Sequence, residues 1–577
     1  MRAAFAAIHA GDWPRAAAIA AKVVAAAPSS ADAHHLLAVT ARHTGRLEDA
    51  IASLERAVAL RPAFFEAWLN LGNACLEAQD PGRALERYAK ALALDPSSPQ
   101  LHNNIGNAQR DARRPALAIE AYRRALALDP RYASAHANLA NVLKDLGDAQ
   151  GAVAEFRQAL ALAPDRTDVW SNLLFTLNCL DGVSADAVFG EHRAFGERFG
   201  ARIAPLPPVP AAPLAGRRLR VGYVSADFRK HAVATFFEPV LDAHDRARVE
   251  VFCYYNQLVG DEVTQRIRAR ADRFEAVHGL SDRDLAAKIR ADRIDVLVDL
   301  SGHTADNRLP LFAWRAAPVQ ATWLGYLGTT GMRAIDYRLT DAHADPEGAT
   351  EALHTERLWR LPQTMWCYRP YSEAPAVDAL PCDASGHITF ACLNNPGKVT
   401  RSMLALWATI LRRVDGARLI LLASPHPART AELQAFFAEQ GGGGRVELVA
   451  RQPLRDYLAL YGRADIALDT SPYAGGATTC DALWMGVPVV SLATTRSFGR
   501  SGATILANAG LPDLVTAAAD DYVERAVELA GDRDRLRKLR ASLRDTMARS
   551  PLADASAFAR NLENALVAMF ESRTAGG

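Results

Sequence analysis

Three short segments place glycine or small residues beside polar side chains directly after apolar runs. They are VGYVSADFRKHAV with His231, ACLNNPGKVT with Asn395 and Lys398, and LDTSPYAGGATTCDALW with Gly475 and Asp481. Glycine lets backbone amides approach a diphosphate, and a helix N-terminus there favours negative charge. A lysine nearby can neutralise charge that builds on a leaving phosphate. The segments therefore predict a phosphate-ligand site, although the third also fits an ordinary helix start capped by threonine.

Other common catalytic motifs point elsewhere or are missing. Residues 282–284 and 532–534 each spell Asp-Arg-Asp, the metal–diphosphate pattern, but both lie in Arg-rich helical stretches, where surface charge pairing is expected. The chain contains no His-Glu-x-x-His, no Gly-x-x-x-x-Gly-Lys-Ser/Thr and no Gly-x-Ser-x-Gly. We therefore expect no metal site, and we exclude zinc-hydrolase, P-loop and serine-elbow chemistry.

The elements that must position the three segments alternate between strands and helices. From residue 218, apolar runs such as LRVGYVS, VEVFCYY, IDVLVDL, ITFACL, ARLILL and GVPVVSL are separated by helix-length stretches. This order predicts parallel sheets with crossover helices. A Pro- and Ser-containing break near 370–387 divides the run into two Rossmann-like lobes, 218–370 and 371–577, the second including the C-terminal helices. Ligands of such folds bind at the carboxyl ends of the strands, so we expect the site in the cleft between the lobes.

The first 203 residues carry a repeat of 34 residues. Prolines fall at 28, 62, 96, 130 and 164, and small residues (72, 106) and bulky ones (88, 122) keep the same step. This is the tetratricopeptide pattern, in which proline ends the second helix of each pair and small residues lie where the helices touch. Residues 1–203 are thus predicted to form an α superhelix. The segment 204–217, rich in proline, is predicted to be a stiff linker.

Asparagine recurs inside these repeats at the same step, although it is a mediocre helix former. The row consists of Asn70, Asn104, Asn138 and Asn172. One interpretation is a solvated or locally hydrogen-bonded face inherited by duplication. The interpretation we favour is a peptide-binding groove, because a carboxamide offers a donor and an acceptor to the backbone of an extended peptide.

The composition of the chain limits which binding partners and which cellular compartment are expected. The 66 basic and 65 acidic residues leave a net charge of +1, which argues against nucleic-acid binding through bulk charge. Seven cysteines without a Cys-x-x-Cys pair favour a reducing cytoplasm. The sequence contains no run of 18 uncharged apolar residues, so no membrane span is predicted. The Ala-rich N-terminus is interpreted as the first repeat helices.

Together these features resemble the O-GlcNAc transferases of glycosyltransferase family 41. The resemblance rests on the repeats, the asparagine row, VGYVSADFRKH, DLSGHTADNRLPLFAWRAAPVQATWLGYLGTTG and SPYAGGATTCDALWMGVP. It implies a GT-B fold, UDP-GlcNAc as donor substrate, no cofactor or metal, and protein Ser/Thr hydroxyls as acceptors. The repeats would guide the acceptor as an extended peptide, and they also offer a surface for a homodimer.

The resemblance assigns roles to matching residues. His231 would lie against sugar and acceptor as a candidate general base, and Lys398 would neutralise the departing UDP. Donor contacts would come from Asn395, Tyr457, Gly475, Gly476, Ala477, Thr478, Asp481, Gly325 and His303. Each assignment has a plainer alternative: a helix cap for His231 or Asp481, a solvated side chain for Lys398, core packing for Tyr457 and a structural role for His303.

Two departures keep other functions open. The donor turn reads GGATT where animal members have more polar residues, and only a short break separates the lobes where those members have an additional domain. The same architecture would also serve a protein O-fucosyltransferase using GDP-fucose, as in the SPINDLY-like branch. A third hypothesis is a repeat scaffold with a nucleotide-binding domain that has no turnover.

Overall fold

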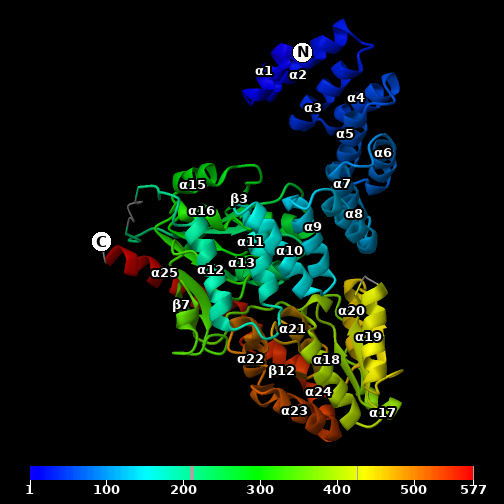
Figure 1. The fold of residues 1–577 in the computed structure, drawn as a ribbon. Helices are drawn as coiled ribbons and strands as arrows, with labels where there is room; N and C mark the ends of the chain where they lie inside the picture. The colour runs from blue at the N-terminus through cyan, green and yellow to red at the C-terminus, as the bar shows by residue number, and fades with distance from the viewer. Residues whose placement is uncertain (208–212, 425–426, 576–577) are drawn as a thin grey trace. The chain divides into compact units, whose positions relative to one another are not determined.

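The computed structural model describes residues 1–207, 213–424 and 427–575, so part of the predicted linker, 208–212, lies outside the described residues. The chain forms two compact units (Figure 1). The first comprises residues 1–143 and 154–164, and the second comprises residues 144–153 and 165–577. Each unit is considered by itself.

Antiparallel helix pairs build the repeat region, as the 34-residue step predicts. In chain order they are α1 (Arg2–His9), α2 (Trp13–Ala26), α3 (Ala31–His43), α4 (Leu47–Leu60), α5 (Phe65–Glu77), α6 (Pro81–Leu94), α7 (Pro99–Asp111), α8 (Pro115–Leu128), α9 (Ala133–Asp145) and α10 (Ala149–Leu162). Residues 144–153, which comprise the end of α9, the loop after it and the start of α10, belong to the second unit.

The small and bulky rows of the repeat are two sides of one contact. A Cβ added at Gly72 would lie 2.3 Å from the ring of Tyr88, and one at Gly106 would lie 2.4 Å from Tyr122. The two tyrosine side chains are fully buried. Only glycine therefore allows the first helix of these repeats to approach the second so closely.

A further row, which the sequence analysis did not include, explains how the proline turns are closed. Ring N–H groups donate to the carbonyl of the proline six residues earlier at 2.8–3.0 Å, in the pairs His34–Pro28, Trp68–Pro62, His102–Pro96 and His136–Pro130. The donors keep the 34-residue step, but the residue is histidine in three pairs and tryptophan in one, so the one-letter sequence does not show the N–H group that they share. Each bond satisfies a carbonyl at a helix end.

The second unit contains two parallel sheets. The first has the order β3-β2-β1-β4-β5-β6-β7, and the second has the order β10-β9-β8-β11-β12-β13. The strands of the first are β1 (Leu219–Ser225), β2 (Val249–Tyr255), β3 (Arg273–Ala276), β4 (Val296–Asp299), β5 (Val319–Thr322), β6 (Tyr337–Asp341) and β7 (Arg357–Leu361). Those of the second are β8 (Thr389–Cys392), β9 (Arg418–Leu422), β10 (Val446–Val449), β11 (Ile466–Leu468), β12 (Val489–Leu492) and β13 (Val515–Thr516).

The three segments follow strands at the point in each sheet where the order of strand addition reverses, which is the topological switch point. The reversal lies between β1 and β4 in the first sheet and between β8 and β11 in the second. His231 follows β1, Lys398 follows β8 and Gly475 follows β11. The predicted parallel sheets with crossover helices are confirmed. Loops at such points are where open α/β sheets bind ligands. The strands that the sequence did not reveal, β3, β6, β7 and β13, are short or lie toward sheet edges, where apolar runs are interrupted by charge.

Helices cover both sheets. Around the first they are α13 (Ala232–Ala243), α14 (Glu262–Arg270), α15 (Asp282–Ala291) and α16 (Leu309–Ala313). Around the second they are α17 (Pro381–Ser385), α18 (Arg401–Arg413), α19 (Pro427–Glu439), α20 (Leu454–Leu460), α21 (Ala477–Trp484), α22 (Ser501–Asn508), α23 (Ala519–Gly531) and α24 (Arg533–Arg549). None of the helices in the described ranges is long and apolar enough to cross a membrane.

The boundary predicted at residue 203 differs from the structure. Helices α11 (Thr167–Leu177) and α12 (Ala185–Phe199) belong to the second unit. Asn178 Nδ2 and His192 Nε2 lie 3.0 and 2.7 Å from the hydroxyl of Tyr326 in the first lobe. The repeat-like sequence continues past the first unit, but its last helices pack on the α/β lobes.

The C-terminal helix α25 (Ala555–Ala575) also departs from the prediction, which placed it with the second lobe. It packs against α13 and runs beside β7 of the first sheet (Figure 1). Glu563 is fully buried there and accepts hydrogen bonds from His244 Nδ1 at 3.0 Å and Arg248 at 3.1 Å. A buried carboxylate with these partners anchors the end of the chain to the first lobe.

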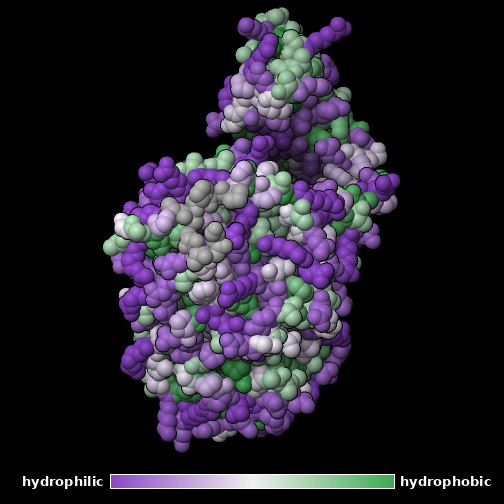
Figure 2. Space-filling model, turned by 90° about the vertical axis from the view of Figure 1, so that its left-hand side faces the viewer, coloured by the Kyte–Doolittle hydropathy of each residue, from purple (hydrophilic) through white to green (hydrophobic). Residues whose placement is uncertain are grey.

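The surface matches the composition. On the face drawn in Figure 2, polar residues predominate and apolar ones are scattered among them. This pattern is expected of a chain in which 23% of the residues are charged.

The Gly72–Tyr88 contact generates a paired prediction. Gly72→Ala should destabilise the repeat unit by about 1–3 kcal/mol, because the added methyl overlaps a buried ring. Gly82→Ala, on the exposed side of α6, should be neutral or slightly stabilising, because its Cβ would approach no atom closer than 3.6 Å and alanine favours helix. Urea titrations followed by circular dichroism compare the two variants. Equal midpoints would contradict the proposed packing.

Candidate active site

The turn after β11 is held by one buried carboxylate. Asp469 Oδ1 accepts hydrogen bonds from the amide of Gly475 at 2.7 Å and from Asn394 Nδ2 at 3.0 Å. Its Oδ2 accepts from the hydroxyl of Ser491 at 2.8 Å. The amide of Gly475 is therefore occupied by Asp469. Gly475 instead makes room, since a Cβ there would lie 2.5 Å from Thr478 Oγ1.

The start of α21 supplies the amides that are available to an anion. Gly476 is the N-cap residue and no side chain caps the helix. Because the first amides of a helix have no intrahelical partner, Ala477 and Thr478 present theirs at a partly exposed surface. Trp366, which the sequence analysis did not identify, packs on this turn, since a Cβ at Gly476 would lie 3.3 Å from its ring.

Lys398 lies beside this turn, as predicted. Its Nζ donates to the carbonyl of Ala474 at 3.1 Å and lies 3.7 Å from the ring centroid of Tyr473. Desolvation lowers the pKa of Lys398, and within the described residues no carboxylate forms an ion pair with it. A cation held by a carbonyl and an aromatic face, without a neutralising partner, is suited to an incoming phosphate.

Asp481 lies at the other end of α21's first turn, held by tyrosines. Its Oδ1 accepts from the hydroxyl of Tyr368 at 2.8 Å, and its Oδ2 accepts from Tyr457 at 3.1 Å. Burial raises the pKa of the Asp481 carboxyl to about 7. Each oxygen keeps a lone pair for a further donor, which is what a ribose hydroxyl would require. Asp481 and Tyr457, both predicted donor residues, are thus brought together.

The asparagine that reaches the donor turn is not the one predicted. Asn395 is exposed and its side chain accepts from the amide of Gly397 at 2.9 Å, capping the 3₁₀ turn Pro396–Lys398. Its neighbour Asn394 is buried and accepts a hydrogen bond from Thr478. The two amides are adjacent in sequence, and only the direction of the chain leaving β8 decides which one faces the site.

Two predicted sugar-side residues have structural duties instead. His303 is 1% exposed, and both ring nitrogens are bonded, Nε2 to the carbonyl of Thr330 at 2.9 Å and Nδ1 to Ser171 Oγ at 3.1 Å. Neither ring nitrogen is free to bond a nucleotide sugar, so the prediction that His303 contacts the donor substrate is corrected. A Cβ at Gly325 would lie 2.1 Å from the carbonyl oxygen of Leu300, so glycine is required there by backbone packing.

His231 stands at the carboxyl end of β1, across from these groups in the first lobe. It is the N-cap of α13, and its Nδ1 accepts from the amide of Val233 at 3.3 Å. Its side chain is 40% exposed, and its Nδ1 lies 3.5 Å from Oδ2 of the buried Asp227. Partial burial lowers the pKa of His231, while Asp227 opposes this shift. His231 therefore caps α13 through Nδ1 while the rest of its ring stays partly exposed to solvent.

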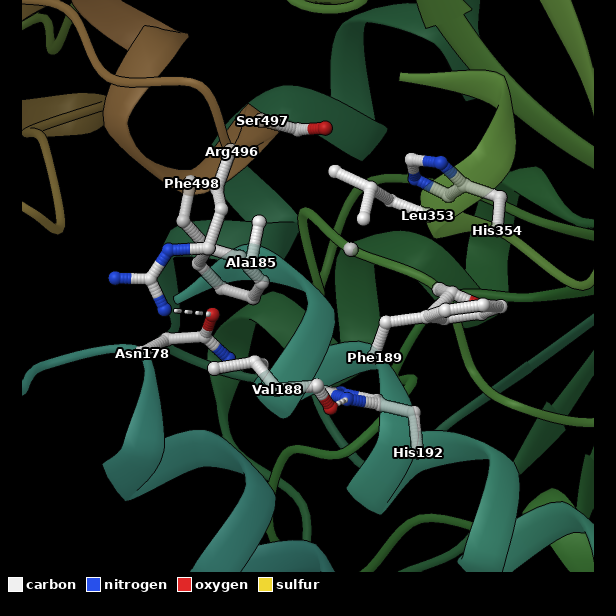
Figure 3. A pocket seen from close by; sticks show the side chains of 12 residues that line it. Asn178, Ala185, Val188, Phe189, His192, Leu353, His354, Arg496, Ser497 and Phe498 are labelled. Carbon is white, nitrogen blue, oxygen red and sulfur yellow. Dashed lines mark hydrogen bonds between the residues drawn. The ribbon is translucent and has the colours of Figure 1, made fainter. Parts of the chain in front are cut away.

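Asn178, which follows α11, and side chains of α12 line a hollow away from these residues. A cavity of about 40 Å³ lies where these helices meet loops of both lobes (Figure 3). Figure 3 shows the Arg496 guanidinium directed at Asn178, whose Oδ1 it contacts at 3.3 Å. His192 lines the same cavity, and burial lowers its pKa to about 4. Because the predicted site residues do not line it, we interpret it as part of the junction between helices and lobes.

The asparagine row forms a bonded ladder in the repeat unit. Asn70 Nδ2 lies 2.8 Å from His35 Nε2, Asn104 Nδ2 donates to Asn73 Oδ1 at 2.9 Å, and Asn138 Nδ2 donates to Asn103 Oδ1 at 2.9 Å. Each amide group thus bonds to the preceding repeat. Asn172 lies on α11 in the second unit, so the predicted four-residue row does not belong to one unit.

In the part of the chain that the structure describes, no group of three or more His, Cys, Asp or Glu side chains is placed to hold a metal ion.

Two parallel α/β lobes, with an uncapped helix start and a desolvated lysine where the strand order of the second sheet reverses, define a protein of the GT-B fold class. The chain belongs to glycosyltransferase family 41, whose family model matches residues 208–368 and 376–562. Tetratricopeptide-repeat models match residues 2–63, 45–99, 116–147 and 133–166. The predicted family and fold are confirmed.

Named relatives support the same assignment. The chain is 38% identical over 406 residues to a protein of Hordeum vulgare named "Probable UDP-N-acetylglucosamine--peptide N-acetylglucosaminyltransferase SPINDLY", covering 69% of this chain and 43% of that protein. Identity to the Arabidopsis thaliana protein of the same enzyme name designated SEC is 31%, covering 62% and 38%. The chain thus spans less than half the length of these relatives.

A solved structure covers almost the whole fold. A mutant of the Thermobaculum terrenum O-GlcNAc transferase is 36% identical, with a TM-score of 0.83, and the match covers 89% of this chain and 98% of that one. Repeats and both lobes therefore occur together in a protein of known structure.

The raised pKa of Asp481 predicts how nucleotide-sugar affinity changes with pH. Above about pH 7 the carboxylate is ionised and can accept from ribose hydroxyls, so affinity for UDP-GlcNAc should weaken by up to about tenfold per pH unit below 7. UDP-GlcNAc is a suitable probe because its phosphates stay ionised in this range. Titration calorimetry from pH 5.5 to 8.5 measures the profile.

The matched control is Asp481→Asn, which keeps the shape of the side chain and removes the titration. It should bind more weakly than the unchanged protein at pH 8 and show a flat profile below pH 7. Loss of charge on Lys398 would act in the opposite direction, by weakening binding at high pH. An unchanged acid limb in the variant would remove Asp481 from the donor site.

Proposed function

We propose that this chain transfers GlcNAc from UDP-GlcNAc to Ser or Thr hydroxyls of proteins, with inversion and without a metal. The observation that carries the proposal is Lys398, an unneutralised cation 3.1 Å from the carbonyl of Ala474 in the turn that leads to the uncapped start of α21. Membership of family 41 and the printed names of the relatives support the donor and the acceptor.

The groups of the second lobe act on the leaving side of the reaction. As the bond between the anomeric carbon and the diphosphate breaks, negative charge grows on the phosphate oxygens. Lys398 Nζ and the first amides of α21 would stabilise that charge, which is the work a metal performs in other transferases. Asp481 with its tyrosines would hold the ribose, so the anomeric carbon is presented toward the first lobe and His231.

The acceptor would be held as an extended chain by the amide ladder of the repeats. The Nδ2 groups of Asn104 and Asn138 already bond to the preceding repeat, which fixes their orientation. A peptide amide would bond the carbonyl oxygen of Asn138, or the second lone pair of Asn104 Oδ1, which already accepts from Asn103 Nδ2 at 3.3 Å. A ladder that contacts backbone would accept many sequences.

A homodimer through the repeats is proposed as well, and sedimentation of the full chain tests it.

Transfer from labelled donors tests the activity. With UDP-[³H]GlcNAc and a protein lysate, the full chain should label proteins, and Lys398→Ala should lower kcat by a factor of about 10²–10³. Lys538→Ala, on the exposed side of α24, is the matched control and should leave the rate unchanged. Circular dichroism verifies that both variants fold.

Other outcomes separate the remaining hypotheses. Label transferred from GDP-[³H]fucose alone would reject UDP-GlcNAc as donor. Binding of UDP without transfer from either donor would support the scaffold hypothesis. Full activity in Lys398→Ala would remove the lysine from the mechanism.

The ladder has its own test. Replacing Asn70, Asn104 and Asn138 together by alanine should raise KM for protein acceptors several-fold, while affinity for UDP stays unchanged, because the replaced residues lie in the first unit and the donor-side residues lie in the second. Gln100→Ala, exposed on α7, is the control. An unchanged KM for every acceptor protein would favour the solvated-face interpretation.

A further inference from the structure

A buried carboxylate in the first lobe lacks the partners that such groups normally have. Asp227 follows β1 and is 4% exposed, and its Oδ2 has no hydrogen-bond partner. The Nε of neighbouring Arg229 is also buried without a partner. Because buried polar atoms are almost always bonded, an unpaired oxygen beside a candidate catalytic residue requires an explanation.

The nearest candidate donor to this oxygen is the ring of His231. The distance from Nδ1 to Asp227 Oδ2 is 3.5 Å, slightly beyond a hydrogen bond. Nδ1 instead accepts the amide of Val233 at 3.3 Å, a long bond for this type. A shift of a few tenths of an ångström would exchange one partner for the other.

The choice between these two partners decides the tautomer of the neutral ring. While Nδ1 accepts from Val233, the proton resides on Nε2, and Nε2 can only donate. When Nδ1 carries the proton and donates to Asp227, the lone pair of Nε2 is free to accept a proton. The second state is the one that general-base chemistry requires.

We propose that Asp227 is a positioning residue that holds His231 in the Nδ1-protonated tautomer during transfer. The inference rests on the proposed function. The acceptor O–H bond breaks and its proton goes to His231 Nε2. The hydroxyl oxygen forms the bond to the anomeric carbon, and the bond to the diphosphate breaks with its electron pair left on UDP. Asp227 then stabilises the imidazolium.

The charges around the pair allow Asp227 to act as a carboxylate. Burial raises its pKa, and His231 and Arg229 oppose this shift, while Asp306 from the loop after β4 adds to it. On the α14 side, Asp261 accepts from the amide of Lys230 at 2.7 Å, and Glu262 pairs with Lys230 Nζ at 2.5 Å. Lys230 is therefore held by these two acidic residues. Arg229 is then the cation that faces Asp227, 3.9 Å from its Oδ1.

Asp227→Asn is the discriminating variant. Its carboxamide can donate to Nδ1 and would fix the wrong tautomer, so kcat should fall by a factor of about 10²–10⁴ with little change in KM for UDP-GlcNAc. Asp227→Glu keeps the charge and should recover part of the loss, and its pH profile should retain the acid limb of His231. Asp306→Asn is the control, because it removes a nearby charge without a bond to the ring, and it should stay within about threefold of the unchanged protein.

A spectroscopic readout tests the pair without relying on turnover. In the full chain labelled with ¹⁵N-histidine, the His231 signal is identified by its loss in His231→Gln. With saturating UDP, Nδ1 should be the protonated nitrogen in the unchanged protein and Nε2 in Asp227→Asn. Affinity for UDP, equal in both, verifies that the variant is folded.

The outcomes separate this inference from the proposed function. The expected tautomers in a protein that transfers no sugar would uphold the pairing and reject the activity. The same tautomer in both proteins, or full kcat in Asp227→Asn, would overturn the positioning role even if GlcNAc transfer is established.

Discussion

The donor side of the site depends on one buried carboxylate. Asp469 binds the amides of Thr470 and Gly475, the side chain of Asn394 and the hydroxyl of Ser491. These bonds offset the desolvation that raises its pKa. They also hold the turn after β11 against the loop after β8, two segments about 75 residues apart in sequence. Without this fixed turn, the start of α21 and Lys398 would not face the same space.

Aromatic packing extends that rigidity to the helices at the end of the repeats. Tyr473, whose ring lies under Lys398, also packs edge-on against Phe175 of α11 and Phe498, with centroid distances of 5.6 and 4.9 Å. A helix that follows the repeat pattern is therefore part of the packing behind Lys398. Because such packing restricts the lysine to few rotamers, less entropy is lost when a diphosphate binds.

The first lobe is organised differently, around polar groups left partly unsatisfied. Near the amino end of β2, Glu563 of α25 accepts hydrogen bonds from His244, Arg248 and the amide of Asp245. At the carboxyl end of β1, in contrast, Asp227 and Arg229 keep unpaired atoms beside an exposed histidine. Fully bonded networks provide stability, whereas unpaired buried atoms cost it, so they are tolerated where a ligand or a reaction uses them.

The sequence by itself determined the elements whose signal is local or periodic. The 34-residue step, the apolar runs of the central strands and the order of strands and helices depend on neighbouring residues, and they were enough to place Lys398, Gly476 and Asp481 in one site. The tertiary structure alone decided that α11, α12 and α25 join lobes distant in sequence, that Asn394 rather than Asn395 faces the donor turn, and that His303 is buried. These outcomes depend on which face of an element meets a partner 84 to 319 residues away in the sequence, and a chain read residue by residue contains no local trace of that partner.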